Sequence, residues 1–263
     1  MFLKTIRRLL APHAECETLE NGRLVVLRLT RPQARNAFSP QMCDTILKCT
    51  QEVSSSSSQA RALILTGSSG MFCAGKDLKA SLSHSEIEAS EYYLKTVSAV
   101  KGLLSVPVPL IVSIEGACLG LGLEMALAGD LRVSGESSKI GFPEIGLNLF
   151  PGCGGSVLLP MILGNVHLAS DLILTGRKLS AREALDINLI SRVVSDGEAF
   201  DHARLLAEFL LGKNRELLVR AKKVIRYDFN NRLKDWMAVS QHNREIVGKL
   251  PEHLKSLSEF AKR

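Results

Sequence analysis

Short runs of aliphatic and β-branched residues alternate with polar, glycine-containing stretches through the first part of the chain. Three of these runs are typical of buried strands, namely Leu24–Thr30, Ala62–Thr66 and Leu110–Ile114. The first run follows an Asn21-Gly22 turn, which is a strong hairpin signal, so we expect it to pair with residues 16–20.

Apolar residues at helical spacing lie between and after these runs. The pattern predicts helices at Pro40–Val53 and from about His84 to Leu104. Two short strands, Leu131–Ser134 and Lys139–Phe142, precede a region beyond Ser156 in which the strand pattern fades. The helices predicted for that region are Val157–Leu163, Val166–Leu174, Ala181–Leu185, Phe200–Leu211, Glu216–Tyr227 and Leu233–Val247.

This order of elements predicts an α/β protein. Buried strands that alternate with helices form a helix-covered sheet, and the later run of helices adds a helical region. We expect an α/β core over residues 15–195 and a helical C-terminal region over residues 196–263. Of the 263 residues, 46% are hydrophobic, which is enough for a proper core. No apolar run approaches the roughly 18 to 20 residues that span a bilayer.

Residues 1–14 have the composition of a mitochondrial targeting leader. The segment carries Lys4, Arg7 and Arg8 and has no acidic residue. On a helical wheel its apolar residues gather on one side and its basic residues on the other, as in such leaders. We therefore expect a mitochondrial protein, with the cytoplasm as the alternative location.

The net charge of +6 is concentrated in one stretch. Eight basic and three acidic residues lie between Lys213 and Asp235. Such a helix can meet phosphates of a cofactor or a nucleic acid. An apolar stripe opposite the charges favours an ordinary solvated face instead. RNA binding is the weaker alternative, and it predicts a salt-dependent affinity that is lost when Lys222, Lys223 and Arg226 are neutralised.

The cysteine pattern argues against a metal site. The six cysteines are scattered, with no C-x-x-C pair and no histidine at metal-binding spacing. We expect free thiols in a reducing compartment and no bound metal. Cys73 and Cys153 fall in glycine-rich segments without an adjacent histidine, so we expect them to serve small-residue packing rather than nucleophilic catalysis.

Two glutamates stand beside glycine-rich turns. Glu124 closes the sequence Gly-Leu-Gly-Leu-Glu directly after a predicted strand, and Glu144 closes Gly-Phe-Pro-Glu shortly before a second glycine cluster at residues 152–155. Two carboxyl groups can share acid and base work in a proton transfer. The alternative for Glu124 is a first-turn glutamate that the helix dipole favours.

Backbone N–H groups near these turns are candidates for binding an anion. The segment Phe72–Leu78 follows one buried strand, and the turn before Leu121 follows another. The first N–H groups of a helix lack intrahelical partners. One donor from each turn would form an oxyanion hole, which stabilises a carbonyl oxygen that gains negative charge.

The chain resembles the enoyl-CoA hydratase/isomerase (crotonase) superfamily across nearly its whole length. The resemblance is carried by the segments Thr30–Ala37, Phe72–Leu78, Gly120–Glu124, Phe142–Leu147, Phe150–Gly155 and Leu174–Ala184, and by the closing segment Glu259–Arg263. It implies a crotonase-like core of repeated ββα units, and assembly into homotrimers or homohexamers.

The resemblance also implies roles for individual residues. Glu124 and Glu144 match the two hydratase glutamates, and the N–H groups of Ala74 and Leu121 would hold the thioester oxygen. Glu124 would activate a water for attack at C3, and Glu144 would deliver a proton to C2. The residues expected to bind the substrate and its coenzyme A are Ala34, Arg35, Ala37, Ala74, Gly75, Lys76, Asp77 and Leu121. Coenzyme A is part of the substrate, and no metal or nicotinamide cofactor is implied.

The resemblance thus indicates an enoyl-CoA hydratase that adds water to a 2-enoyl-CoA. Members that only isomerise a double bond usually keep the equivalent of Glu144 and lose the equivalent of Glu124. The alternatives are an isomerase or acyl-CoA hydrolase of the same superfamily, or an RNA-binding relative of the hydratases.

Overall fold

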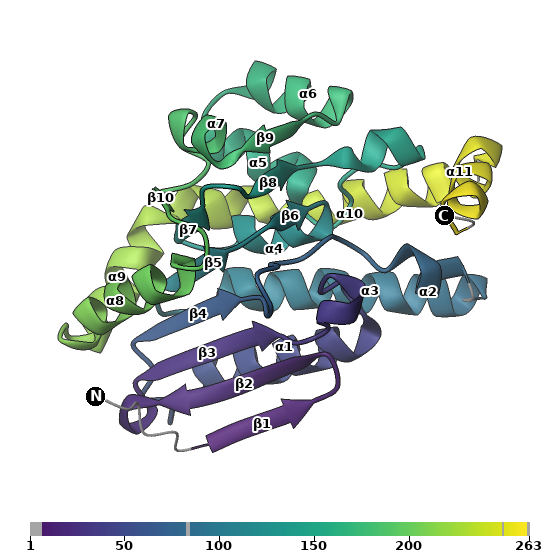
Figure 1. Cartoon of the computed structure of the whole chain (residues 1–263). Helices are drawn as coiled ribbons and strands as arrows, with labels where there is room; N and C mark the ends of the chain where they lie inside the picture. The colour runs from purple at the N-terminus through teal and green to yellow at the C-terminus, as the bar shows by residue number, and fades with distance from the viewer. Residues whose placement is uncertain (1–6, 83–84, 249, 262–263) are drawn as a thin grey trace.

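A seven-stranded sheet with helices on both faces organises the chain (Figure 1). This computed structural model describes residues 7–82, 85–248 and 250–261. The strands in spatial order are β1 (Arg7–Ala11), β2 (Ala14–Leu19), β3 (Leu24–Leu29), β4 (Ala62–Thr66), β5 (Leu110–Ile114), β7 (Leu131–Gly135) and β10 (Arg192–Val194). The first three strands pair antiparallel, and β3 to β10 are parallel neighbours.

The central parallel strands β4 and β5 are buried along their whole length, which explains their continuous apolar runs. Along β4, Leu63 and Leu65 belong to the larger core cluster, which also holds residues of α1 (Pro40–Ser54) and α3 (Glu86–Ser105). Ile64 points the other way, into a second cluster formed with α8 (Ala199–Leu211). Both layers of helices therefore hold the parallel strands in place.

A second, smaller sheet positions the glycine-rich turns of the candidate site. It contains β6 (Ala117–Leu119), β8 (Lys139–Gly141) and β9 (Lys178–Ser180). Isolated β-bridges join Cys73 to Cys118 of β6 and Phe38 to Lys76. They connect the Phe72–Leu78 turn to this sheet and to the segment that contains Phe38. Each of these turns follows a strand of the large sheet and precedes a helix, so repeated strand–strand–helix units bring the turns side by side.

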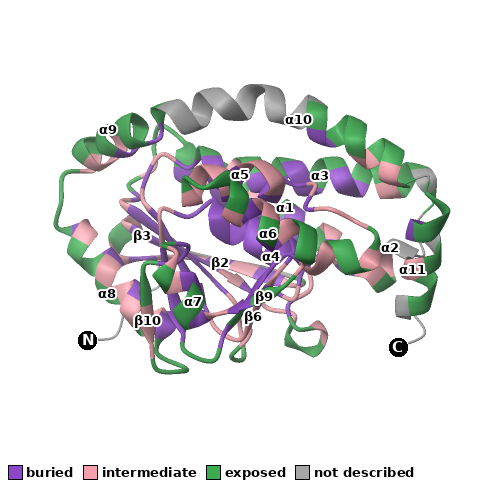
Figure 2. Cartoon of the chain, turned by 90° about the horizontal axis from the view of Figure 1, so that it is seen from above, coloured by how far each residue is buried: buried purple, intermediate pink, exposed green. Residues whose placement is uncertain are grey.

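The remaining helices surround these units. They are α2 (Leu78–Leu82), α4 (Leu121–Leu127), α5 (Gly155–Leu163), α6 (Val166–Thr175), α7 (Ala181–Asp186), α9 (Arg215–Ile225), α10 (Tyr227–Gly248) and α11 (Pro251–Ala261). Seen from above, α9, α10 and α11 form an arc along one side of the molecule (Figure 2). Within the described ranges, no helix combines the length and apolar character that a membrane crossing needs.

The α/β class and most predicted elements are confirmed. The strands Ala62–Thr66 and Leu110–Ile114 have the predicted bounds, and the hairpin of β2 with β3 forms around the Asn21-Gly22 turn. Sequence patterns revealed β8 but not β6, β9 and β10, which also have only three residues each.

The N-terminal segment needs a correction. Residues 7–11 form strand β1, which pairs with β2, and not the amphipathic helix that the wheel pattern suggests. Residues 1–6 lie outside the described part of the chain. A role of residues 1–14 in targeting stays a prediction.

Candidate active site

Helix α4 places Glu124 in the interior. The chain leaves β6 at Gly120, whose positive φ of 53° favours glycine, and α4 begins at the next residue. Glu124 is 2% exposed. Its Oε1 accepts hydrogen bonds from the N–H groups of Cys153 and Gly155, each at 2.8 Å. The second glycine cluster thus fixes the orientation of the Glu124 carboxyl group.

The environment of Glu124 raises its pKa to about 7. Burial is the largest cause, since it disfavours the charged form. Hydrogen bonds from the backbone of Gly155, Cys153 and Gly154 and the positive charge of Lys76 lower the pKa and offset part of this effect. A carboxyl group with a pKa near neutrality can accept and release protons at physiological pH.

Glu144 faces the same turn from a short 3-10 helix at Pro143–Leu147. A Cβ atom at Gly120 would lie 2.8 Å from Glu144 Oε1, so the carboxyl group packs directly against the glycine. Glu144 Oε2 is buried without a hydrogen-bond partner among the described residues. Burial, and then repulsion by Glu124, raise the pKa of Glu144 to about 8.

Both glutamates line one cavity of about 910 Å³. The cavity also includes Ala74, Gly75, Lys76 and Leu121 from the predicted set. The C-terminal helices close it, with Arg244 from α10 and His253 from α11 in its wall. Segments that are far apart in the sequence therefore meet at the two carboxyl groups.

The predicted donor Ala74 is wrong as an oxyanion-hole residue. Its N–H donates to the Arg35 carbonyl oxygen at 3.0 Å, so it is already engaged. The next candidate in the same turn is Lys76, whose N–H has no acceptor within the part of the chain that the structure describes, and the same holds for Leu121. Both residues line the cavity.

The two turns that carry these donors are in close contact. Gly75 has a φ of 106°, and a Cβ atom there would lie 3.0 Å from the Leu119 carbonyl oxygen and 3.8 Å from the Leu121 nitrogen. A glycine is therefore needed at position 75 for the turns to approach each other. The geometry brings the Lys76 and Leu121 N–H groups to one edge of the cavity.

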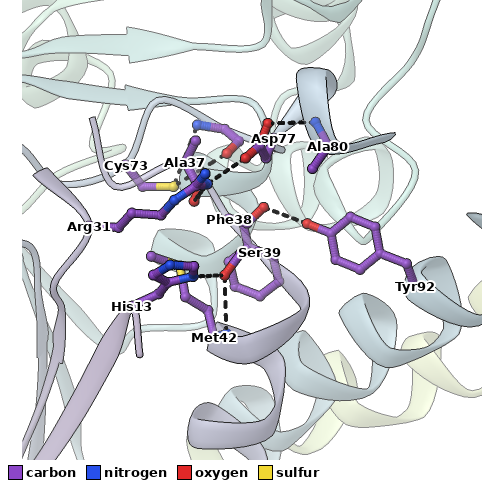
Figure 3. A network of polar contacts seen from close by, with 11 residues as sticks. His13, Arg31, Ala37, Phe38, Ser39, Met42, Cys73, Asp77, Ala80 and Tyr92 are labelled. Atoms are coloured by element: carbon purple, nitrogen blue, oxygen red, sulfur yellow. Dashed lines mark hydrogen bonds and ion pairs between the residues drawn. The ribbon is translucent and has the colours of Figure 1, made fainter. Parts of the chain in front are cut away.

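Four of the residues predicted to bind coenzyme A do not line the cavity. They are Ala34, Arg35, Ala37 and Asp77. The Asp77 carboxylate instead pairs with Arg31 and accepts a hydrogen bond from the Ala80 N–H at 3.0 Å, which secures the start of α2 (Figure 3). The first three residues neighbour the Phe72–Leu78 turn, and their contact with coenzyme A stays a prediction.

The cysteines beside the site are poor nucleophiles. All six cysteines are free and buried, as the free-thiol prediction requires. Burial raises the pKa of Cys73 to about 12, and it raises that of Cys153 as well. Thiols with raised pKa values remain protonated, which supports a packing role. Among the described residues, no cluster of metal-ligating side chains forms a candidate metal site.

Two basic residues at the C-terminal end of α9 point inward, whereas Arg220 and Lys223 are exposed, so the predicted solvated face is confirmed only in part. Lys222 and Arg226 are 8% and 9% exposed, and both pair with Asp130 at 2.8 Å. Two of the three residues proposed to bind RNA therefore dock α9 onto the core. The apolar residues Leu217 and Val224 of this helix are 64% and 75% exposed instead.

Sequence patterns missed Lys76 as a backbone donor and Arg244 as part of the cavity. Lys76 stands in the recognised Phe72–Leu78 segment, but the direction of its N–H depends on the bridge between Phe38 and Lys76. Arg244 belongs to a long helix of mixed polarity, with no signal that links it to the glycine-rich turns.

Comparisons with known proteins agree with the motifs. The family model for enoyl-CoA hydratase/isomerase matches residues 20–263. YngF of Bacillus subtilis is 33% identical over 92% of this chain and 93% of its own length. The human mitochondrial enoyl-CoA hydratase domain-containing protein 2 is 36% identical over 74% of this chain and 68% of its own length. An enoyl-CoA hydratase/isomerase structure from Pseudoalteromonas atlantica superimposes with a TM-score of 0.85, covers 95% of this chain and 97% of its own, and is 25% identical. The chain belongs to the enoyl-CoA hydratase/isomerase family, whose members act on acyl-CoA thioesters.

Proposed function

We propose that this protein is an enoyl-CoA hydratase that adds water across the 2,3 double bond of a 2-enoyl-CoA. The observation that carries the proposal is that Glu124 and Glu144 line one cavity, with pKa values near neutrality. Hydration needs a base for the water and an acid for C2, whereas moving a double bond needs one group that shuttles a proton. Two carboxyl groups favour the hydratase over the isomerase.

In the proposed mechanism the thioester oxygen accepts hydrogen bonds from the N–H groups of Lys76 and Leu121. Glu124, ionised, takes a proton from the water as its oxygen attacks C3. The electrons move to the thioester oxygen, and the two donors stabilise this enolate. Glu144, protonated, then gives its proton to C2. The reaction is redox-neutral, and we propose no cofactor beyond the coenzyme A of the substrate.

The first test is the activity of the wild type and of Glu124→Gln. We expect the wild type to hydrate a short 2-enoyl-CoA. The reaction can be monitored by the loss of absorbance of the conjugated thioester. Glu124→Gln should lower the hydration rate by about 100- to 10,000-fold, since the variant loses the base. The nearly unchanged size of the side chain keeps the contacts with the Cys153 and Gly155 backbone possible.

A parallel assay with a 3-enoyl-CoA separates the two activities. If the wild type adds no water to any chain length, the hydratase assignment fails. If it shifts the double bond of the 3-enoyl-CoA and Glu124→Gln keeps most of that activity, the protein is an isomerase.

The oxyanion hole can be tested by removing one N–H group. Leu121 is the first residue of α4, a position where proline is tolerated because its N–H lacks an intrahelical partner. We expect Leu121→Pro to lower kcat by about 100- to 1000-fold. Leu121→Ala is the matched control, because it loses the side chain but keeps the N–H. Equal losses in both variants would show that the side chain matters and the donor does not.

We also propose that the protein forms homotrimers or homohexamers. Helix α9 exposes apolar side chains at Leu217, Val224 and Ile225, the last of which is 81% exposed. Several exposed apolar side chains on one helix favour burial against another chain. Light scattering during size-exclusion chromatography would give the mass of the assembly, and a monomer would contradict the proposal.

Relatives of this protein include mitochondrial and bacterial proteins, so they do not decide its location. The basic, acid-free N-terminal segment supports mitochondrial import as our proposal. Imaging of the full chain with a C-terminal fluorescent tag, beside a mitochondrial marker, would test it.

A further inference from the structure

Two cationic side chains in the cavity transfer no proton in the proposed hydration. Lys76 and Arg244 line the same cavity as Glu124 and Glu144. The Lys76 ammonium nitrogen lies 4.9 Å from the centre of the Tyr92 ring, and Tyr92 is 3% exposed. The ammonium group therefore packs on a buried ring, which lies behind the residues that line the cavity. The Arg244 guanidinium carbon lies 4.1 Å from the centre of the neighbouring Tyr93 ring.

These two cations differ from the well-buried ones elsewhere in the protein. Lys222 and Arg226 share the Asp130 carboxylate. Among the described residues, neither Lys76 nor Arg244 forms an ion pair, and Arg244 makes one side-chain hydrogen bond, to the Ala89 carbonyl oxygen at 3.3 Å. A partly buried cation without a counter-ion is costly, so its presence in a ligand cavity favours an anionic ligand.

The catalytic carboxyl groups compensate this charge only in part. The pKa values of about 7 for Glu124 and about 8 for Glu144 mean that the pair carries less than two negative charges near neutral pH. Glu245 also lines the cavity, but its side chain is exposed at the rim. Burial also lowers the pKa values of Lys76 and Arg244, so a bound anion would favour the charged forms of both side chains.

We propose that the acyl chain selected by this site ends in a carboxylate, which Lys76 and Arg244 bind. This inference rests on the proposed hydratase function. Lys76 itself indicates the chain length: its N–H binds the thioester oxygen, and its ammonium group stands at the end of a four-carbon stem. Because both groups belong to one residue, an acyl chain that binds both of them must be short.

The phosphates of coenzyme A are the other anions that these cations could bind. They are less suitable, because the ammonium group of Lys76 packs on the almost completely buried Tyr92. The two sources of negative charge can be separated experimentally, since every CoA thioester carries the same phosphates but only some carry an acyl carboxylate.

The test compares two substrates of nearly the same shape. One is the CoA monothioester of 2-pentenedioic acid, and the other is 5-methyl-2-hexenoyl-CoA, in which two methyl groups replace the two carboxylate oxygens. We expect the wild type to show a kcat/KM at least 10-fold higher for the carboxylated substrate. A ratio of one or below would overturn the inference and leave the hydratase function intact.

The variants Lys76→Met and Arg244→Gln locate the effect. Each should lower the ratio of the two kcat/KM values by about 10- to 100-fold, the loss typical of one hydrogen bond to a charged group. Lys95→Met is the control, because Lys95 is an exposed lysine of α3 that pairs with Asp44 at 3.2 Å and should leave the ratio unchanged. If both substrates lose the same factor, the cations bind the phosphates, and the inference is wrong.

A binding measurement keeps the inference testable even if neither substrate reacts, which would contradict the proposed hydratase. The saturated analogues are glutaryl-CoA and 5-methylhexanoyl-CoA. Tighter binding of glutaryl-CoA in calorimetry, with the preference lost in Arg244→Gln, would support the carboxylate site. Equal affinities would overturn it.

Discussion

Replacing Glu144 with glutamine is expected to lower the hydration rate by about 100- to 10,000-fold, the usual contribution of one general acid or base. Glu144 packs against Gly120 and holds its proton near neutral pH, because burial and Glu124 raise its pKa to about 8. Glutamine has nearly the same shape but cannot deliver a proton to C2. We therefore expect kcat to fall while the affinity for the thioester changes little.

The pH dependence of the wild type provides a second readout. A base with a pKa of about 7 is lost as the pH falls below 7, and an acid with a pKa of about 8 is lost as the pH rises above 8. The profile of kcat/KM against pH should therefore be bell-shaped. The two apparent pKa values that it gives belong to the Glu124–Glu144 pair and not to single residues. In Glu144→Gln the alkaline limb should disappear from the residual activity.

Glu245→Gln is the matched control for this experiment. Glu245 lines the same cavity but lies at its exposed rim, so the same chemical change should leave the rate and both limbs in place. A Glu144→Gln enzyme with near-normal kcat would show that another group protonates C2.

Asp130→Asn is expected to lower the free energy of unfolding by about 3–5 kcal/mol, the range measured when one partner of a buried ion pair is removed. The Asp130 carboxylate pairs with Lys222 and Arg226 at 2.8 Å each, and it also accepts the Leu110 N–H at 2.7 Å. The variant leaves two buried cations without their counter-ion at the junction of α9 and the sheet. Urea denaturation at fixed protein concentration would measure the change.

The control for this prediction is an exposed ion pair on α9, the helix that carries Lys222. Glu216→Gln removes the partner of Arg220 at 2.8 Å, but both side chains are more than half exposed. Such exposed pairs contribute about 0.5 kcal/mol or less. Similar losses in the two variants would mean that burial does not strengthen the Asp130 cluster.

Local sequence patterns determined much of the fold. The strands Ala62–Thr66 and Leu110–Ile114 were predictable because short apolar runs between turn signals have few other uses in a folded chain. The glycine-rich turns also identified Glu124 and Glu144, since close backbone approach requires glycine and leaves a recognisable spacing. These features depend on neighbours within a few residues.

The direction of side chains and N–H groups was decided by the tertiary structure. In α9 the sequence contains an apolar stripe and a basic face, and either face could meet the core. The half-buried carboxylate of Asp130 pairs with Lys222 and Arg226, so these two side chains point inward while Arg220 stays exposed. The sequence of the helix alone does not predict that Asp130 lies next to it.

The active site shows the same division. The sequence by itself indicated that the glycine-rich turn at residues 72–78 belongs to the candidate site, because the residue types and spacing are local. Only the tertiary structure decided that the Ala74 N–H donates to the Arg35 carbonyl oxygen, while the Lys76 N–H finds no acceptor in residues 7–82, 85–248 and 250–261. It also decided that Arg244 lines the cavity. Hydrogen-bond partners, burial and pKa values depend on which distant segments meet, and one segment of sequence cannot specify its partners.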